Sequence, residues 1–155
     1  MLDLDSIDLD WVVQGLQDQT DYEHRWLLDP RTGEVVLWTS DSGIDGDPVE
    51  LDELDLIVIH PLPSHVWYRD MVDFAYSISD RAAGERLGRT LEGRRVFRRF
   101  KDELHERHPE LVSTWHAWSD ARALVRAVEW LSDQGLVDDV AARRFLDAQP
   151  EVPLP

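Results

Sequence analysis

The pattern of apolar and polar positions changes from strand-like to helical near residue 64. Three short segments before that point are rich in β-branched and aromatic residues, which is typical of strands. They cover residues 22–28, 34–39 and 56–60. A short amphipathic helix is predicted ahead of them over residues 7–17, because apolar residues recur there at helical spacing, and Asp5 or Ser6 would be its N-cap.

The segment between the first two predicted strands, Asp29-Pro30-Arg31-Thr32-Gly33, has the composition of a hairpin loop. Proline suits the first central position of a turn, and the Asp29 side chain can accept hydrogen bonds from the backbone that follows it. Gly33 would supply the positive φ that ends such a loop. The third strand is predicted to end at Pro61, which lacks an amide hydrogen.

Helical spacing of apolar residues continues from residue 64 almost to the end of the chain. Predicted helices begin near Ser64, Asp80, Arg94, Pro109 and Ser119, and a last short one covers residues 140–146. Strands followed by helices indicate an α+β fold. We therefore predict a small antiparallel sheet of about three strands, packed against a C-terminal layer of about five helices, with a short N-terminal helix.

Length and composition indicate one domain over residues 1–148, followed by a Pro-rich tail over residues 149–155. The chain has no cysteine, which excludes disulfides, thiolate nucleophiles and cysteine-based metal sites. It also shows neither an apolar run of membrane-spanning length nor a signal peptide. We expect a soluble, cytoplasmic protein that has no membrane partner.

The chain is strongly acidic, with 32 acidic and 16 basic side chains and a net charge of −16. A protein of this charge is not expected to bind duplex DNA by general electrostatic attraction. The charge is also segregated, because residues 1–60 contain 16 acidic and 2 basic side chains, whereas residues 81–101 contain 8 basic and 2 acidic ones.

The predicted helix over residues 94–108 is the main candidate for a binding surface. Phe97, Phe100 and Leu104 are spaced to face a core. The candidate contacts to an anion or partner are Arg94, Arg95, Arg98, Arg99 and Lys101. If the helix begins near Gly93, its first amides and the helix dipole would add to the attraction. An acidic protein surface, an RNA strand or a phosphate ligand would fit.

The alternative is that these cations are satisfied within the protein itself. Arg98 with Asp102 and Arg99 with Glu103 have the i, i+4 spacing of helical ion pairs. The carboxylates of the N-terminal half offer further partners. In that case the arginines would be structural and no binding surface would remain.

Metal binding and catalysis have weaker support. His105, His108 and His116 match no standard zinc spacing. The loop over residues 41–55 resembles a calcium loop through Asp41, Asp45, Gly46 and Asp52, but Gly43 provides no side-chain oxygen at the third position. No nucleophile elbow, P-loop or dinucleotide fingerprint occurs. We predict no metal, no cofactor and no catalytic residue.

The order of several motifs resembles a family of uncharacterised bacterial proteins. The matching segments span about residues 20–135 and are LDPRTGEV from Leu28, YRDMVDF from Tyr68, GRRVFRRFKD from Gly93, Trp115, and EWL from Glu129. Arg95-Val96 stands where the family pattern has glycine-alanine. The positions of structural interest in these motifs are Asp29, Gly33, Gly93, Phe97, Phe100 and Asp102. The resemblance implies no activity.

We therefore predict a non-enzymatic binding module that uses its arginine-rich helix to contact an anionic partner. Three alternatives stay open. They are a protein that binds a nucleotide or single-stranded RNA, an acidic inhibitor or immunity-type protein that blocks the basic site of a toxin or nuclease, and an enzyme with a carboxylate site. The sequence leaves the oligomeric state open.

Overall fold

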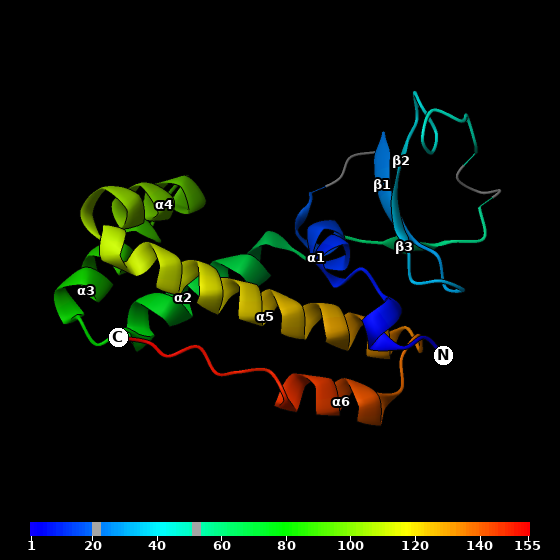
Figure 1. Ribbon diagram of the computed structural model, residues 1–155. Helices are drawn as coiled ribbons and strands as arrows, with labels where there is room; N and C mark the ends of the chain where they lie inside the picture. The colour runs from blue at the N-terminus through cyan, green and yellow to red at the C-terminus, as the bar shows by residue number, and fades with distance from the viewer. Residues whose placement is uncertain (20–22, 51–53) are drawn as a thin grey trace. The chain divides into compact units, whose positions relative to one another are not determined.

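A computed structural model describes residues 1–19, 23–50 and 54–155 (Figure 1). These residues form two compact units, which we describe one at a time. Unit 1 comprises Met1–Leu62 and Ala123–Gln149, and unit 2 comprises Pro63–Arg122 and Pro150–Pro155. Together they have the predicted α+β fold. One domain over residues 1–148 stays a prediction.

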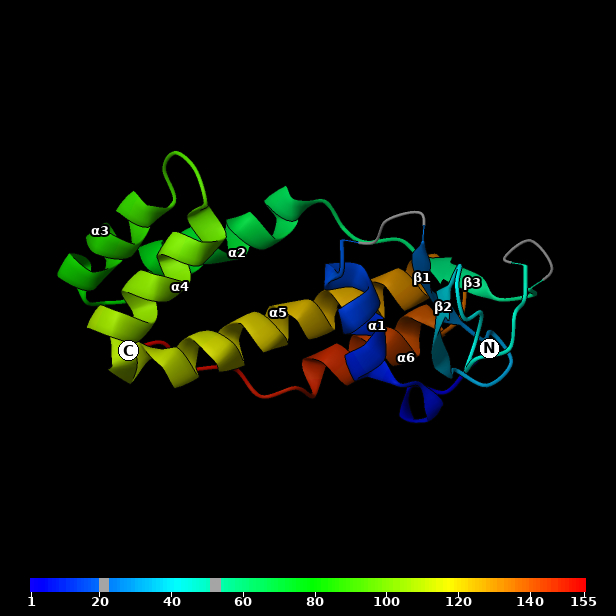
Figure 2. The same cartoon turned by 90° about the horizontal axis from the view of Figure 1, so that it is seen from above.

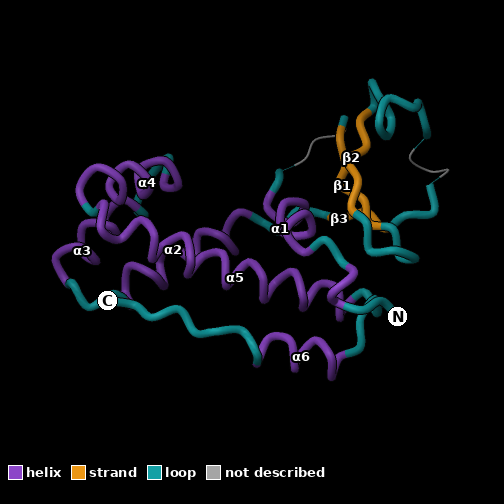
Figure 3. Tube along the Cα trace, viewed as in Figure 1, coloured by secondary structure: helices purple, strands orange, loops and turns teal. Residues whose placement is uncertain are grey.

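The sheet of unit 1 has three antiparallel strands, as the sequence predicts (Figure 3). The central strand is β1 (His24–Leu28), which pairs with β2 (Val35–Thr39) on one side and with β3 (Ile57–Ile59) on the other. All three strands are short, so the sheet needs a covering element for stability.

That covering element is helix α1 (Leu9–Gln17), whose Val12 and Leu16 are buried. Gly15 allows the close approach, because a Cβ at this position would lie 2.8 Å from Cγ2 of Ile59. The predicted cap was wrong, since α1 begins after Asp8, whose side chain makes no cap hydrogen bond. A separate 3-10 turn, η1 (Leu4–Ser6), lies where the helix was expected to begin.

The hairpin between β1 and β2 forms the predicted turn. The Asp29 carboxylate accepts hydrogen bonds from the backbone N–H of Arg31, at 2.9 Å, and from its Nε, at 3.1 Å. The Arg31 side chain, followed by its backbone N–H, lowers the pKa of Asp29 below its usual value. Gly33 has φ +82°, which confirms the conformational role predicted for this glycine.

Unit 2 consists of helices and one short tail. It contains α2 (Ser64–Ser77), α3 (Arg81–Thr90), α4 (Val96–Arg107), the 3-10 turn η3 (Pro109–Leu111) and the first half of α5 (Val112–Asp133), and Figure 2 shows α3 next to α4. The second half of α5 and α6 (Asp139–Asp147) belong to unit 1.

The predicted start of a separate helix at Ser119 was wrong, because α5 runs through this residue without a break. Serine favours an N-cap, but its helix penalty is only a few tenths of a kcal/mol relative to alanine, and the residues on both sides are apolar at helical spacing. The predicted start of a helix near Asp80 is confirmed, since α3 begins at Arg81 and the Asp80 carboxylate caps it by accepting the N–H of Ala83 at 3.1 Å.

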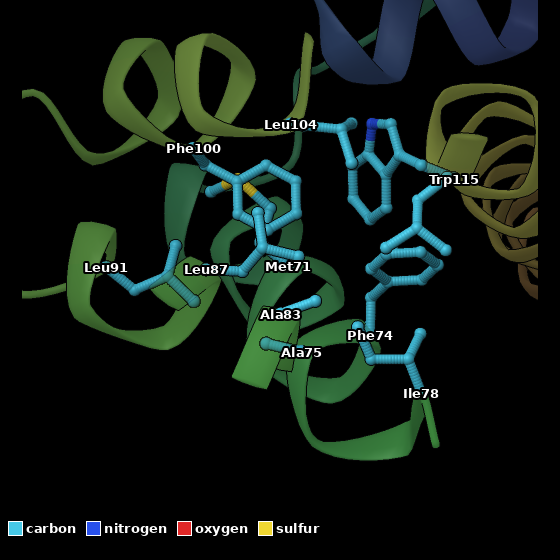
Figure 4. Close-up of a cluster of buried hydrophobic side chains, with 11 residues drawn as sticks. Met71, Phe74, Ala75, Ile78, Ala83, Leu87, Leu91, Phe100, Leu104 and Trp115 are labelled. Atoms are coloured by element: carbon cyan, nitrogen blue, oxygen red, sulfur yellow. The ribbon is translucent and has the colours of Figure 1, made fainter. Parts of the chain in front are cut away.

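Three aromatic rings form the centre of the unit 2 core (Figure 4). The Trp115 ring centroid lies 5.1 Å from that of Phe74 and 4.9 Å from that of Phe100. The tryptophan therefore links α2 to α4 through edge-to-face contacts. Each such buried ring stabilises the fold by about 1.5–3 kcal/mol through its removal from water.

An ion-pair cluster and the C-terminal tail add further contacts within unit 2. The Arg122 guanidinium of α5 lies 2.9 Å from the buried carboxylate of Asp70 and 2.9 Å from that of Asp73, both on α2. The tail also returns to this unit, because Leu154 packs against the core and the N–H of Ser79 donates to the Pro155 carbonyl at 2.8 Å.

Candidate anion-binding surface

Five cationic side chains gather around the connection between α3 and α4. This connection covers residues 91–95, between the last residue of α3, Thr90, and the first residue of α4, Val96. We call this group the cationic turn, and its members are Arg94, Arg95, Arg98, Arg99 and Lys101. All five are exposed to solvent.

The backbone of the turn is unusual at two positions. Gly93 has φ +85° and Arg95, the N-cap of α4, has φ +55° in the left-handed region. The side chain of this N-cap makes no cap hydrogen bond, since a guanidinium cannot accept one. The first amides of α4 are therefore not capped by Arg95, and the positive end of the helix dipole lies among the arginines.

Arg99 has a structural role in the turn. Its Nη1 donates to the Glu92 carbonyl at 2.6 Å and its Nη2 to the Arg89 carbonyl at 3.5 Å, so the guanidinium binds carbonyls at and just beyond the end of α3. The predicted pair with Glu103 was wrong. The Glu103 carboxylate instead lies 3.0 Å from Nε2 of the buried His108 and 3.8 Å from Nε of Arg107.

The predicted pair of Arg98 with Asp102 is confirmed, but it is weak. The two charged groups lie 4.0 Å apart, and their side chains are 77% and 61% exposed. An ion pair this open to water contributes at most about 0.5 kcal/mol. Arg98 is therefore free to exchange Asp102 for another anion.

The remaining three cations have no partner in the part of the chain that the structure describes. Within residues 1–19, 23–50 and 54–155, the side chains of Arg94, Arg95 and Lys101 make neither a hydrogen bond nor an ion pair. Internal pairing thus accounts for Arg99 and, weakly, for Arg98. It leaves three like charges close in sequence and open to solvent.

The two phenylalanines of the arginine-rich helix differ. Phe100 is fully buried, as predicted, whereas Phe97 is 38% exposed, so the prediction that it faces the core was wrong. Phe97 lies in the first turn of α4, next to the N-cap, whereas the buried residues of this helix, Phe100 and Leu104, lie in later turns. Its ring is therefore part of the surface beside the cationic turn.

A cleft of about 950 Å³ between α2 and α3 borders the same turn. It is lined by Tyr76, Glu85, Arg89 and Glu92, among others, and sequence reasoning missed it. The available signal was the pair Gly84 and Gly88, four residues apart on one face of α3. A Cβ on Gly84 would lie 2.5 Å from the Ala75 carbonyl oxygen, whereas a Cβ on Gly88 would meet nothing within 4 Å.

Comparison with known proteins gives the family. The model of the uncharacterised protein family UPF0158 matches residues 6–152, almost the whole chain. The chain belongs to UPF0158. A curated relative, UPF0158 protein PA5073 from Pseudomonas aeruginosa, is 31% identical over 137 residues, which is 84% of each chain. No solved structure matches the chain.

In the described part of this UPF0158 chain, His105, His108 and His116 do not form a metal site. No three histidine or acidic residues there are placed to hold a metal ion. His105 and His116 face each other with ring centroids 6.2 Å apart, while His108 lies beside Glu103. Asp52 of the acidic loop lies outside the described residues.

None of the described helices of this UPF0158 chain is long and apolar enough to cross a bilayer.

Proposed function

We propose that this chain is a binding protein whose cationic turn contacts an anionic macromolecule. The proposal rests on one observation above all, the three exposed cations that have no partner among the described residues. An anion bound there would lessen the mutual repulsion of these charges. It would also accept hydrogen bonds from the backbone amides at the start of α4, which the Arg95 side chain does not cap.

A macromolecule suits this surface better than a small metabolite. The cations lie on an exposed turn and along one helix, whereas small-molecule sites are concave and bury most of the ligand. Exposed charges of this kind give strong binding only when several act together on a polymer, through release of its counterions.

The test compares two variants that remove the same charge. Arg94→Ala/Lys101→Ala removes two cations of the turn, and Arg143→Ala/Arg144→Ala removes two exposed cations of α6. Binding of labelled single-stranded RNA and of labelled polyglutamate is measured by fluorescence anisotropy over a range of salt concentrations. Thermal melts followed by circular dichroism verify that each variant is folded.

The turn variant is expected to bind at least one polymer about tenfold more weakly than the α6 variant. With RNA, the slope of log Kd against log salt should fall by about 1.4, since each phosphate contact on a single strand contributes about 0.7. The proposal would be overturned if both variants lost the same amount of binding affinity relative to the wild-type chain, or if neither polymer bound at low salt.

A further inference from the structure

The cleft between α2 and α3 has chemistry that the cationic turn lacks. The helices approach closely at Gly84, whereas a Cβ on Gly88 would meet nothing within 4 Å, so the space there is open. The hydroxyl of Tyr68 donates to the Leu91 carbonyl at 2.9 Å and so ties α2 to the end of α3. The cleft is thus bounded by one close helix contact and one hydrogen bond.

An aromatic ring, two carboxylates and the guanidinium groups of Arg81 and Arg89 line this cleft. The Tyr76 side chain is 86% exposed, so its ring is available for stacking. Neither Glu85 nor Glu92 makes a side-chain hydrogen bond or ion pair within the described residues. Two free hydrogen-bond acceptors beside an exposed ring favour a flat ligand that carries N–H donors.

The cleft and the cationic turn are continuous. Glu92 lines the cleft, and its carbonyl accepts the Arg99 guanidinium at 2.6 Å. Arg94 follows two residues later, so its Cα lies within about 8 Å of that of Glu92. If a ligand placed a flat group in the cleft, the charged groups next to that flat group would therefore lie close to the cationic turn.

We infer that the cleft receives a guanine base of single-stranded nucleic acid whose phosphates contact the cationic turn. This inference rests on the proposed function and names its partner. Guanine presents two adjacent N–H donors that match a carboxylate, whereas the single N–H of uracil lies between two carbonyl oxygens that a carboxylate repels. The exposed Tyr76 ring supplies the stacking surface that single-strand binding proteins use.

A nucleobase suits this lining better than an acidic protein surface does. Arg81 and Arg89 line the cleft as well, so its charge is balanced. A neutral base can donate hydrogen bonds to Glu85 and Glu92 and accept them from the two guanidinium groups, whereas a carboxylate can only accept.

The experiment measures the preference for guanine separately from the attraction to phosphate. Anisotropy is recorded for a labelled oligouridine and for the same oligouridine with one central guanine. The wild-type chain is expected to bind the guanine probe about tenfold more tightly, a typical effect of one well-placed base. Tyr76→Ala should lose most of this preference, and Tyr76→Phe should keep it.

The carboxylates are tested with Glu85→Gln/Glu92→Gln, which should bring the ratio of the two affinities close to one and leave binding of the oligouridine equal or stronger. The salt dependence should stay unchanged in Tyr76→Ala, because that variant removes no charge. All these positions are exposed or line the cleft, so the variants are expected to fold, and circular dichroism verifies this.

Each failure points to a different step. Wild-type binding that is sensitive to Arg94→Ala/Lys101→Ala, but equal for the two probes, overturns the guanine site and supports the proposed function. Binding of polyglutamate without binding of either RNA does the same. Absence of binding to all three polymers overturns both.

Discussion

Arg95 occupies a backbone conformation that L-residues rarely adopt. Its φ of +55° places it in the left-handed region at the N-cap of α4. This conformation costs about 1–2 kcal/mol for a residue with a Cβ, and glycine avoids that cost. In the family pattern that the sequence resembles, glycine stands where this chain has Arg95. The left-handed backbone gives a physical reason for a glycine there, and the arginine adds an exposed cation beside Arg94, Arg98 and Lys101.

Arg95→Gly is therefore expected to raise the free energy of unfolding by about 0.5–1 kcal/mol, the relief of strain less the greater backbone entropy of unfolded glycine. The same variant should weaken binding of an anionic polymer, because it removes one cation of the turn. Arg94→Gly is the matched control, since it removes an equal charge at a residue whose φ is not positive. It should lower stability, and urea denaturation distinguishes the two outcomes. Equal effects of both substitutions would show that the left-handed strain is negligible.

At the level of elements, the two glycines of α3 have opposite surroundings within one helix. Gly84→Ala would place a Cβ 2.5 Å from the Ala75 carbonyl oxygen of α2, so the helices must move apart. Gly88→Ala meets nothing within 4 Å and gains the higher helix propensity of alanine.

We expect Gly84→Ala to destabilise unit 2 by about 1–3 kcal/mol, the usual cost of overpacking. Gly88→Ala should stabilise it by up to about 1 kcal/mol. Thermal or urea unfolding of both variants provides the comparison. A loss of stability in Gly88→Ala similar to that in Gly84→Ala would contradict the close contact at Gly84 and the open cleft at Gly88.

The sequence was sufficient for elements whose signals are local. Asp29 and Gly33 identify the hairpin because the turn depends on one side-chain acceptor and one positive φ. The break predicted at Ser119 failed, because a capping residue signals a helix start only where the preceding backbone has left the helix. The periodicity of the arginine-rich helix also placed Phe97 in the core, although only the later turns of α4 enter it.

The candidate site likewise has features that depend on residues close in the chain, which the sequence predicts, and features that depend on packing, which it does not. Sequence alone located the five cations and the pair of Arg98 with Asp102, since both depend on residues close in the chain. It did not identify the carbonyls that hold Arg99, because these depend on how α3 and α4 pack. For the same reason the cleft beside Tyr76 could not be predicted, since it depends on how α2 and α3 pack.

At the scale of the whole molecule, charge is divided unevenly between the two units. Unit 1 contains 21 acidic and 5 basic side chains, a net charge of −16, whereas unit 2 contains 11 of each. The excess of negative charge that argues against general binding to duplex DNA thus belongs entirely to unit 1. Unit 2, which carries the cationic turn, has no net charge, so this excess is no argument against local contact between that turn and an anion.

This division makes salt act differently on the two units. Carboxylates crowded into unit 1 repel one another, and raising the ionic strength from about 0.01 M to about 0.3 M shortens the screening length from roughly 30 Å to less than 10 Å. Amide hydrogen exchange followed by mass spectrometry should therefore show slower exchange in the strands and in α1 at high salt. Helices α2 to α4 provide the internal control, because unit 2 is neutral. A similar gain of protection in both units would mean that salt acts through general solvent effects and that repulsion within unit 1 is not a significant cost.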